Sequence, residues 1–253
     1  MNFFIYHMPP LLTVLGALYV LVALPQLVKL LGYWRGMLPR IGQILRQNLL
    51  RVAASVVMIV LLISYLDLPL TLSLVRLDKV IHSYTFWDFI CSCAEGGFVS
   101  AVIFTLVLLA DSLGLWRLAL VSRISLMTSI YGGLANALLK FIFNRQRPAI
   151  GLDQWHFFAF FSSSPRHWLD LTYAFNSMPS GHTLSTVAAI TPFFLAYPNK
   201  WVRGALVLWA LLVSFSRIYT LNHWLSDVTL AALLGVVVGV AGYQLNSWRL
   251  SHA

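Results

Sequence analysis

Long apolar runs, separated by short polar segments, dominate the pattern of this chain. A helix that crosses the hydrocarbon core of a bilayer needs about 20 mostly apolar residues. Seven runs approach or reach this length, and they cover residues 10–31, 49–66, 97–115, 119–143, 180–197, 201–217 and 225–245. The pattern therefore predicts an all-α protein, a multi-spanning bundle of transmembrane helices.

Two connections are longer than the others, residues 67–96 and residues 144–179. The second connection mixes turn-forming residues, such as Gly151 and Pro165, with aromatic residues, such as Trp155 and Trp168. Aromatic side chains favour the boundary between lipid and water, and turn residues interrupt helices. We expect residues 144–179 to form a loop that lies on the membrane surface.

Composition excludes several classes of protein. Apolar residues make up 59% of the 253 residues and charged residues only 10%, and the mean hydropathy is +0.80. Soluble domains are about 45–50% apolar and about 25% charged, so a soluble enzyme is excluded. A disordered chain is excluded because there is ample apolar surface to bury. The net charge of +9 does not indicate a nucleic-acid partner, because no basic run or basic face accompanies it.

The distribution of positive charge predicts the orientation in the membrane. If both long connections lie outside, ten Lys and Arg residues fall on the inner side and seven on the outer side. Three of the outer seven belong to the candidate site described below, and cytoplasmic loops carry an excess of Lys and Arg. We therefore expect the C-terminus inside. Tryptophans fit the ends of these spans, with Trp34, Trp116, Trp201 and Trp248 at inner ends and Trp87 and Trp224 at outer ends.

The first of three polar clusters ends the predicted span 119–143. Ser129, Gly133, Asn136 and Lys140 are spaced by four, three and four residues, so they share one helical face. Arg147-Pro148 follows where the chain leaves the membrane. Charged residues near a bilayer are costly and mark function. Taken alone, however, this cluster could be a basic helix end.

The second cluster, Pro179-Ser180-Gly181-His182, opens the span 180–197. Ser caps helices, Gly allows close approach to the backbone, and the free N–H groups of a helix start bind anions. The alternative is a capped helix with a histidine that has no chemical role.

The third cluster joins Ser216-Arg217 to His223 and Asp227. His223 and Asp227 are four residues apart at a helix start, so the two side chains can face each other. A carboxylate on one imidazole nitrogen fixes the tautomer and leaves the other nitrogen with a lone pair. The alternative is a surface His–Asp pair beside an arginine that reaches for water.

Together the three clusters predict a phosphate site, because all lie at the outer ends of predicted spans. Lys140, Arg147 and Arg217 match the three outer oxygens of a phosphate. His182 and His223 suit a proton donor and a nucleophile.

These residues resemble the three-part motif of the type-2 phosphatidic acid phosphatase superfamily, which includes lipid phosphate phosphatases and vanadium haloperoxidases. Lys-x₆-Arg-Pro, Pro-Ser-Gly-His and Ser-Arg-x₅-His-x₃-Asp match at all eleven positions, in order. The resemblance implies a core of six helices. Residues 49–253 would then form the membrane-embedded phosphatase domain. Residues 1–48 would add an extra transmembrane helix and a basic cytoplasmic loop. Because seven apolar spans are present, the soluble haloperoxidase branch does not fit.

The resemblance also implies a role for each motif residue. His223 attacks phosphorus and forms a phosphohistidine, and Asp227 orients His223. His182 protonates the leaving oxygen and later activates water. The remaining residues bind phosphate: Lys140, Arg147, Ser180, Gly181, Ser216 and Arg217.

No metal and no other cofactor is expected. The chain has only eight acidic residues, and none forms a ligand cluster with histidines at a suitable spacing. Cys91 and Cys93 are too close in sequence for an easy disulfide and lack a second pair for zinc.

The expected partners are the bilayer and a lipid phosphate, because the predicted site lies where a lipid headgroup sits. Candidates are phosphatidic acid, phosphatidylglycerol phosphate, undecaprenyl diphosphate and lipid A phosphates. The expected location is a bacterial inner membrane, with the site on its periplasmic or outer face. The loop 144–179 carries Arg145, His156, Arg166 and His167, and it either selects headgroups or only lines the surface.

Three other functions stay open as alternatives. A phosphotransferase would pass the phosphoryl group to another lipid. A transporter is disfavoured because no charge lies at the middle of a span. A catalytically inactive lipid-binding protein is disfavoured because no motif position is missing. The sequence leaves the oligomeric state open.

Overall fold

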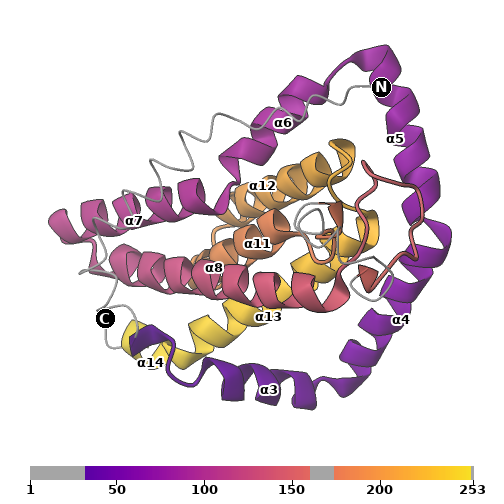
Figure 1. Cartoon of the computed structure of the whole chain (residues 1–253). Coiled ribbons are helices and arrows are strands. Elements are labelled where there is room, and N and C mark those ends of the chain that lie inside the picture. Colours follow the sequence, from indigo (N-terminus) through magenta and orange to yellow (C-terminus); the bar gives the residue numbers. More distant parts are fainter. Residues whose placement is uncertain (1–31, 160–173, 252–253) are drawn as a thin grey trace.

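The computed structural model describes residues 32–159 and 174–251 (Figure 1). The predicted span 10–31 lies outside the described residues, as do Arg166 and His167. The described part is all-α, and it contains the helices α3 Met37–Gln47, α4 Leu49–Tyr65, α5 Asp67–Ile81, α6 Tyr84–Cys93, α7 Gly96–Ser112, α8 Trp116–Phe143, α11 Gly181–Ala196, α12 Lys200–Tyr219, α13 Leu225–Leu245 and α14 Ser247–Ser251. The predicted fold class is confirmed.

Helix α11 forms the centre of the bundle and packs mainly against α8 and α13 (Figure 1). Small residues permit this close packing, as is usual between transmembrane helices. At Gly235 of α13, a Cβ atom would lie only 2.9 Å from the carbonyl oxygen of Leu184 in α11. Any larger residue at 235 would therefore push α13 away from α11.

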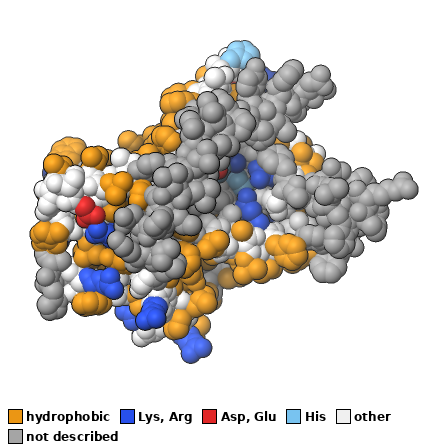
Figure 2. Space-filling model, turned by 60° about the vertical axis from the view of Figure 1, so that its left-hand side comes forward, with side chains coloured by type: hydrophobic (Ala, Val, Ile, Leu, Met, Phe, Trp, Pro, Cys, Tyr) orange, Lys and Arg blue, Asp and Glu red, His pale blue; other side chains and the backbone are white. Residues whose placement is uncertain are grey.

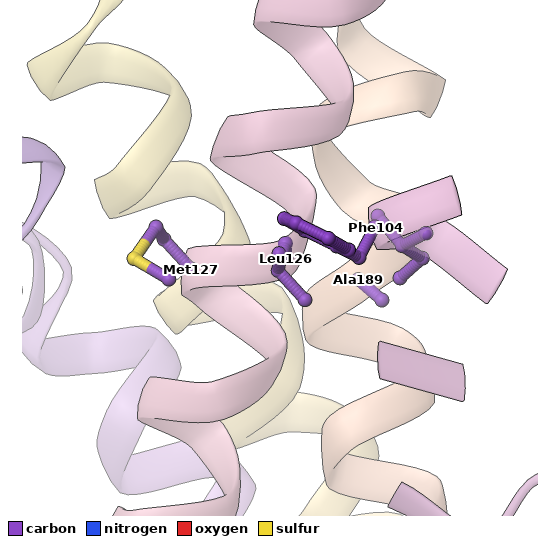
Figure 3. Close-up of a cluster of buried hydrophobic side chains, with 5 residues drawn as sticks. Phe104, Leu126, Met127 and Ala189 are labelled. Carbon is purple, nitrogen blue, oxygen red and sulfur yellow. The ribbon is translucent and has the colours of Figure 1, made fainter. Parts of the chain in front are cut away.

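A cluster of apolar side chains joins α7 to the same centre. Phe104 of α7 and Leu126 of α8 meet Ala189 of α11, and all three are buried (Figure 3). Within a membrane, tight van der Waals packing of this kind replaces the hydrophobic effect as the force that joins helices. The cluster fastens α7, which begins directly after Glu95, to α8 and α11.

The described helices include three that are long and apolar enough to cross a membrane, namely α8, α12 and α13. The count rises to five if each bent pair is one span, since α3 and α4 meet at 85° and α6 and α7 at 50°. Helix α11 is apolar but shorter, with 16 residues. The helices α4, α7, α8, α11, α12 and α13 coincide with the predicted spans from residue 49 onward.

The predicted connection 67–96 is wrong as a loop, because it contains α5 and α6. Each of these helices is shorter than a full membrane span, so a search for runs of 20 residues overlooks them. Leu74 of α5 packs against Ile218 and Tyr219 of α12, and Trp87 of α6 borders the same cluster. Packing against α12 therefore stabilises both helices.

Helix α3 lies within the segment that the sequence predicts as a basic loop. Its apolar side chains Met37, Ile41 and Ile44 pack near Ala241 of α13, and Arg46 is exposed. A helix with one apolar and one basic face is typical of a membrane surface.

Candidate active site

The three polar clusters meet at one end of the bundle. The loops that carry them are joined by hydrogen bonds between distant parts of the chain. The Ser180 N–H donates to the carbonyl oxygen of Asp227 over 3.3 Å, and Nε1 of Trp224 donates to the carbonyl oxygen of Gln146 over 2.8 Å. The start of α11, the start of α13 and the segment after α8 therefore form one unit.

His223 is buried at the centre of this unit. Its Nδ1 lies 2.5 Å from the carbonyl oxygen of Ser177 and 3.8 Å from Oδ2 of Asp227. With Nδ1 turned toward two acceptors, Nε2 is the nitrogen that faces away from them and carries the lone pair. Ser177 thus supplies an orienting contact that sequence reasoning missed.

Burial lowers the pKa of His223 well below its ordinary value, and the charges of Arg147, Arg217 and Lys140 lower it further, against the contribution of Asp227. The neutral form of the imidazole therefore persists into mildly acidic conditions. The His223 N–H donates to the carbonyl oxygen of Arg217 over 3.1 Å, and Arg147 donates to Asn222, the residue before His223, so the structure places these two predicted cations next to His223 in the fold.

Asp227 is fully buried and is held by three donors. Its Oδ2 accepts from the Ser177 hydroxyl over 2.5 Å and from the Trp224 N–H over 2.9 Å, and its Oδ1 pairs with Arg145 over 2.5 Å. A carboxylate with this many charged and neutral donors remains ionised and fixed in position.

Arg145 is a site residue whose role sequence reasoning did not identify. Its guanidinium is completely buried, and besides Asp227 it pairs with the equally buried Asp67 over 2.8 Å. The Ser226 hydroxyl bonds to both Arg145 and Asp67. The suggestion that Arg145 selects headgroups from a surface loop is wrong, because two buried carboxylates engage it.

Trp224 also differs from its expected position at the membrane boundary. The indole is fully buried, and the Arg145 guanidinium lies 5.4 Å from the centre of its ring. Phe157 covers the same guanidinium at 4.9 Å. Cation–π contacts of this kind help to accommodate a buried arginine. Trp224 and Phe157 therefore form part of the wall around the ion network.

The two arginines of the motif, Arg147 and Arg217, are both buried. Arg147 donates to Oδ1 of Asn222 over 2.8 Å. Nε of Arg217 is buried and has no hydrogen-bond partner among the described residues. Buried donors almost always have partners, so this one suits an anionic ligand. Figure 2 shows Lys and Arg side chains gathered in a hollow of one face, with histidine and acidic side chains deeper inside.

His182, in the first turn of α11, faces a residue that sequence reasoning missed. Its Nε2 lies 3.0 Å from Oε2 of Glu95, at the break between α6 and α7. Glu95 therefore holds one nitrogen of the imidazole, and Nδ1 is the nitrogen left for a ligand. The scarcity of acids was a usable signal, since each of the eight carboxylates in so apolar a chain requires an explanation.

Ser180 and Gly181 form the start of α11. The Ser180 hydroxyl is buried and accepts from the Thr183 hydroxyl over 3.2 Å, so it does not cap the helix with its side chain. A Cβ atom at Gly181 would lie 2.9 Å from Nδ2 of Asn136, so glycine is needed for α11 to approach α8. The first N–H groups of any helix lack intrahelical acceptors and remain available to an anion.

Ser216 stands apart from the other predicted phosphate ligands. Its buried hydroxyl donates to the carbonyl oxygen of Val213 over 2.7 Å and accepts from Sγ of Cys91 over 3.3 Å. The contact with Cys91 fastens α12 to α6. Within the part of the chain that the structure describes, no group of three or more His, Cys, Asp or Glu residues could hold a metal ion.

Comparisons with known proteins agree with this arrangement. A family model described as the PAP2 superfamily matches residues 115–251. A lipid A 1-phosphatase of Porphyromonas gingivalis is 35% identical over 133 residues, which cover 52% of this chain and 24% of that protein. An undecaprenyl-diphosphatase of Sulfolobus acidocaldarius is 36% identical over 72 residues, which cover 28% of this chain and 34% of that protein. The matches therefore span less than half of these relatives.

A solved structure shares the fold. The crystal structure of Aquifex aeolicus LpxE superposes with a TM-score of 0.53 at 20% identity, over 71% of this chain and 95% of that one. The family match covers more than half of the chain and includes all three clusters, so the resemblance read from the sequence is confirmed. The chain belongs to the PAP2 superfamily, the type-2 phosphatidic acid phosphatases.

Proposed function

We propose that this protein is an integral membrane phosphatase that hydrolyses a phosphate monoester or diphosphate of a membrane lipid. The observation that carries the proposal is the environment of His223. Its Nδ1 faces Ser177 and Asp227. Arg147 is bonded to the neighbouring Asn222, and the buried Nε of Arg217 has no hydrogen-bond partner among the described residues. The names of the related lipid A 1-phosphatase and undecaprenyl-diphosphatase support the same reaction class.

In the proposed reaction, Nε2 of His223 attacks phosphorus, and the bond to the leaving oxygen breaks as the N–P bond forms. His182 gives its proton to the leaving oxygen. A water molecule, deprotonated by His182, then attacks the phosphohistidine and releases inorganic phosphate. Lys140, Arg147, Arg217 and the N–H groups at the start of α11 stabilise the negative charge on the transferring group. Each such donor contributes about 10²–10³ in rate in other enzymes.

Asp227 and Arg145 act behind the nucleophile. As His223 forms its bond to phosphorus, the imidazole gains positive charge, and the fixed carboxylate of Asp227 stabilises that charge. Arg145 keeps Asp227 in place and compensates its burial. Ser216 contributes through α12, because its contact with Cys91 holds the segment that carries Arg217 against α6.

Glu95 has a positioning role toward His182. A carboxylate 3.0 Å from Nε2 favours the protonated imidazole that is needed to protonate the leaving oxygen. We expect Glu95→Gln to lower turnover about tenfold and to move the alkaline limb of the pH–rate profile to lower pH. The measurement is kcat against pH for the purified variant.

The control for Glu95 is Asp88→Asn, which removes an acidic side chain of α6 outside the site. This variant should keep the wild-type profile. If Glu95→Gln lowered the rate equally at every pH, Glu95 would have a structural role only, and the positioning role would be wrong.

The substrate is proposed from the place of the site. A phosphate site at the end of a membrane bundle fits a lipid headgroup whose tails stay in the bilayer. The candidates remain phosphatidic acid, phosphatidylglycerol phosphate, undecaprenyl diphosphate and lipid A phosphates. The excess of Lys and Arg at the opposite ends of the spans supports an outward-facing site, which is periplasmic in a bacterial inner membrane.

The test is phosphate release by purified protein in detergent, measured against these four lipids with and without excess EDTA. We expect release from at least one lipid, unchanged by EDTA, because no ligand cluster suggests a catalytic metal in the described residues. Loss of activity in EDTA would overturn the metal-free mechanism. Transfer to a second lipid without phosphate release would favour the phosphotransferase alternative.

A further inference from the structure

A large apolar space lies outside the motif residues, along α4 and α13. A cavity of about 1000 Å³ opens between α4 and α13, above the bend that joins α3 to α4. None of the motif residues lines it. One end of it reaches Met178 and Phe157, the residue that covers Arg145.

The walls of the cavity are apolar over most of their length. Aliphatic residues of α4, such as Val56 and Ile59, face residues of α13, such as Val237 and Val240. The lining of α13 runs from Leu230 to Gln244, about 21 Å along the helix axis at 1.5 Å per residue. This length exceeds the depth of one leaflet, about 15 Å, so an acyl chain fits along it.

The polar lining is confined to one end. Arg40, Gln43, Gln47, Asn48, Arg51 and Gln244 gather there. The guanidinium of Arg40 donates to Gln43 and Gln244, and that of Arg51 donates to Asn48. Neutral amides thus hold both guanidinium groups in place without cancelling their charge. Among the described residues, no carboxylate pairs with Arg40 or Arg51.

We propose that this cavity binds a diacyl phospholipid with an anionic headgroup, from the leaflet opposite the catalytic site. The acyl chains lie between α4 and α13, and the phosphate lies at Arg40 and Arg51. Charge complementarity selects the occupant, because a purely apolar partner would leave two guanidinium groups facing it. The bent pair of helices α3 and α4 places these charges at the level of headgroups, where basic residues attract anionic lipids.

The bound lipid would also fill the part of the space between α4 and α13 that side chains leave open. Ile59 and Ile63 of α4 belong to a buried cluster with Leu230 of α13. The cavity extends from there along the large aliphatic residues of both helices and is not filled by the described side chains. A lipid that fills this space would hold α4, and the α5 that follows it, in position. Asp67 begins α5, so the lipid would support the ion network indirectly.

The experiment is native mass spectrometry of the whole protein in detergent, titrated with phosphatidylglycerol and, separately, with phosphatidylcholine. We expect saturable binding that favours phosphatidylglycerol. Arg40→Gln/Arg51→Gln should weaken phosphatidylglycerol binding roughly 10- to 30-fold, from the known attraction of basic residues to anionic lipids. The matched control is Arg46→Gln, which removes an exposed arginine of α3 that does not line the cavity.

Val237→Trp provides an independent test, because the indole would project into the cavity and narrow it while leaving both arginines intact. We expect it to weaken binding of both lipids. Equal weakening by Arg46→Gln and by the double variant would overturn the proposal, as would unchanged binding in Val237→Trp. A dimer that buries the cavity and excludes lipid would overturn it as well.

Discussion

Replacing His223 with Asn is expected to lower phosphate release by at least about 10³-fold, because the variant lacks the attacking nitrogen. Asn can still accept or donate hydrogen bonds near Ser177, so the fold is retained. The measurement is turnover of the best lipid substrate by purified variant and wild type at equal concentration. Wild-type turnover in His223→Asn would contradict the assignment of the nucleophile.

The control for this substitution is His82→Asn. His82 is exposed, lies outside the site and has φ = 51°, a conformation that Asn tolerates well. The His82→Asn variant should keep wild-type activity.

The wild-type enzyme should also keep its activity below pH 6.5, because burial lowers the pKa of His223 and thereby preserves its neutral, nucleophilic form in mild acid.

The second large effect is expected for Arg145→Met. This change leaves Asp67 and Asp227 buried without their shared cation, and breaking a buried pair typically costs about 3–5 kcal/mol. We expect a clearly lower midpoint of thermal unfolding in detergent. We also expect strongly reduced turnover, because Asp227 loses the donor that fixes it behind His223.

Two variants make this result interpretable. Arg145→Met/Asp67→Asn removes one of the two uncompensated carboxylates and should recover part of the lost stability but not the turnover. Arg123→Met removes the cation of an exposed ion pair with Asp111 and should change stability little, since exposed pairs contribute about 0–1 kcal/mol. An unfolding midpoint for Arg145→Met equal to that of Arg123→Met would show that the buried network does not stabilise the fold.

Much of the fold is readable from hydrophobicity alone. The spans predicted from residue 49 onward correspond to α4, α7, α8, α11, α12 and α13. Each of these helices is a long apolar run, which is the signal that hydrophobicity detects. The helices α3, α5 and α6 were not predicted because they are shorter than a membrane span. Their stability comes from packing against α12 or α13. Local composition cannot report such packing.

The candidate site shows the same division. The motif residues can be identified from their spacing in the sequence. The residues that support them can be identified only from contacts between distant parts of the chain. Asp67 and Arg145 are 78 residues apart, and nothing local to either residue predicts the pair. Glu95 reaches His182 only because α7 packs beside α11. Knowing which loop folds over which helix is needed to find these partners.

The most direct test of the central claim is to trap the phosphorylated enzyme with a lipid substrate labelled in its phosphate. Wild type and His182→Ala would be quenched during turnover and assayed for protein-bound label. We predict a label that is stable to base and lost in acid, as phosphohistidine is. In His182→Ala the label should form more slowly, because the leaving oxygen is not protonated, and should then persist, because water is not activated. It should be absent from His223→Asn. Label retained in His223→Asn, or label that survives acid, would contradict the account.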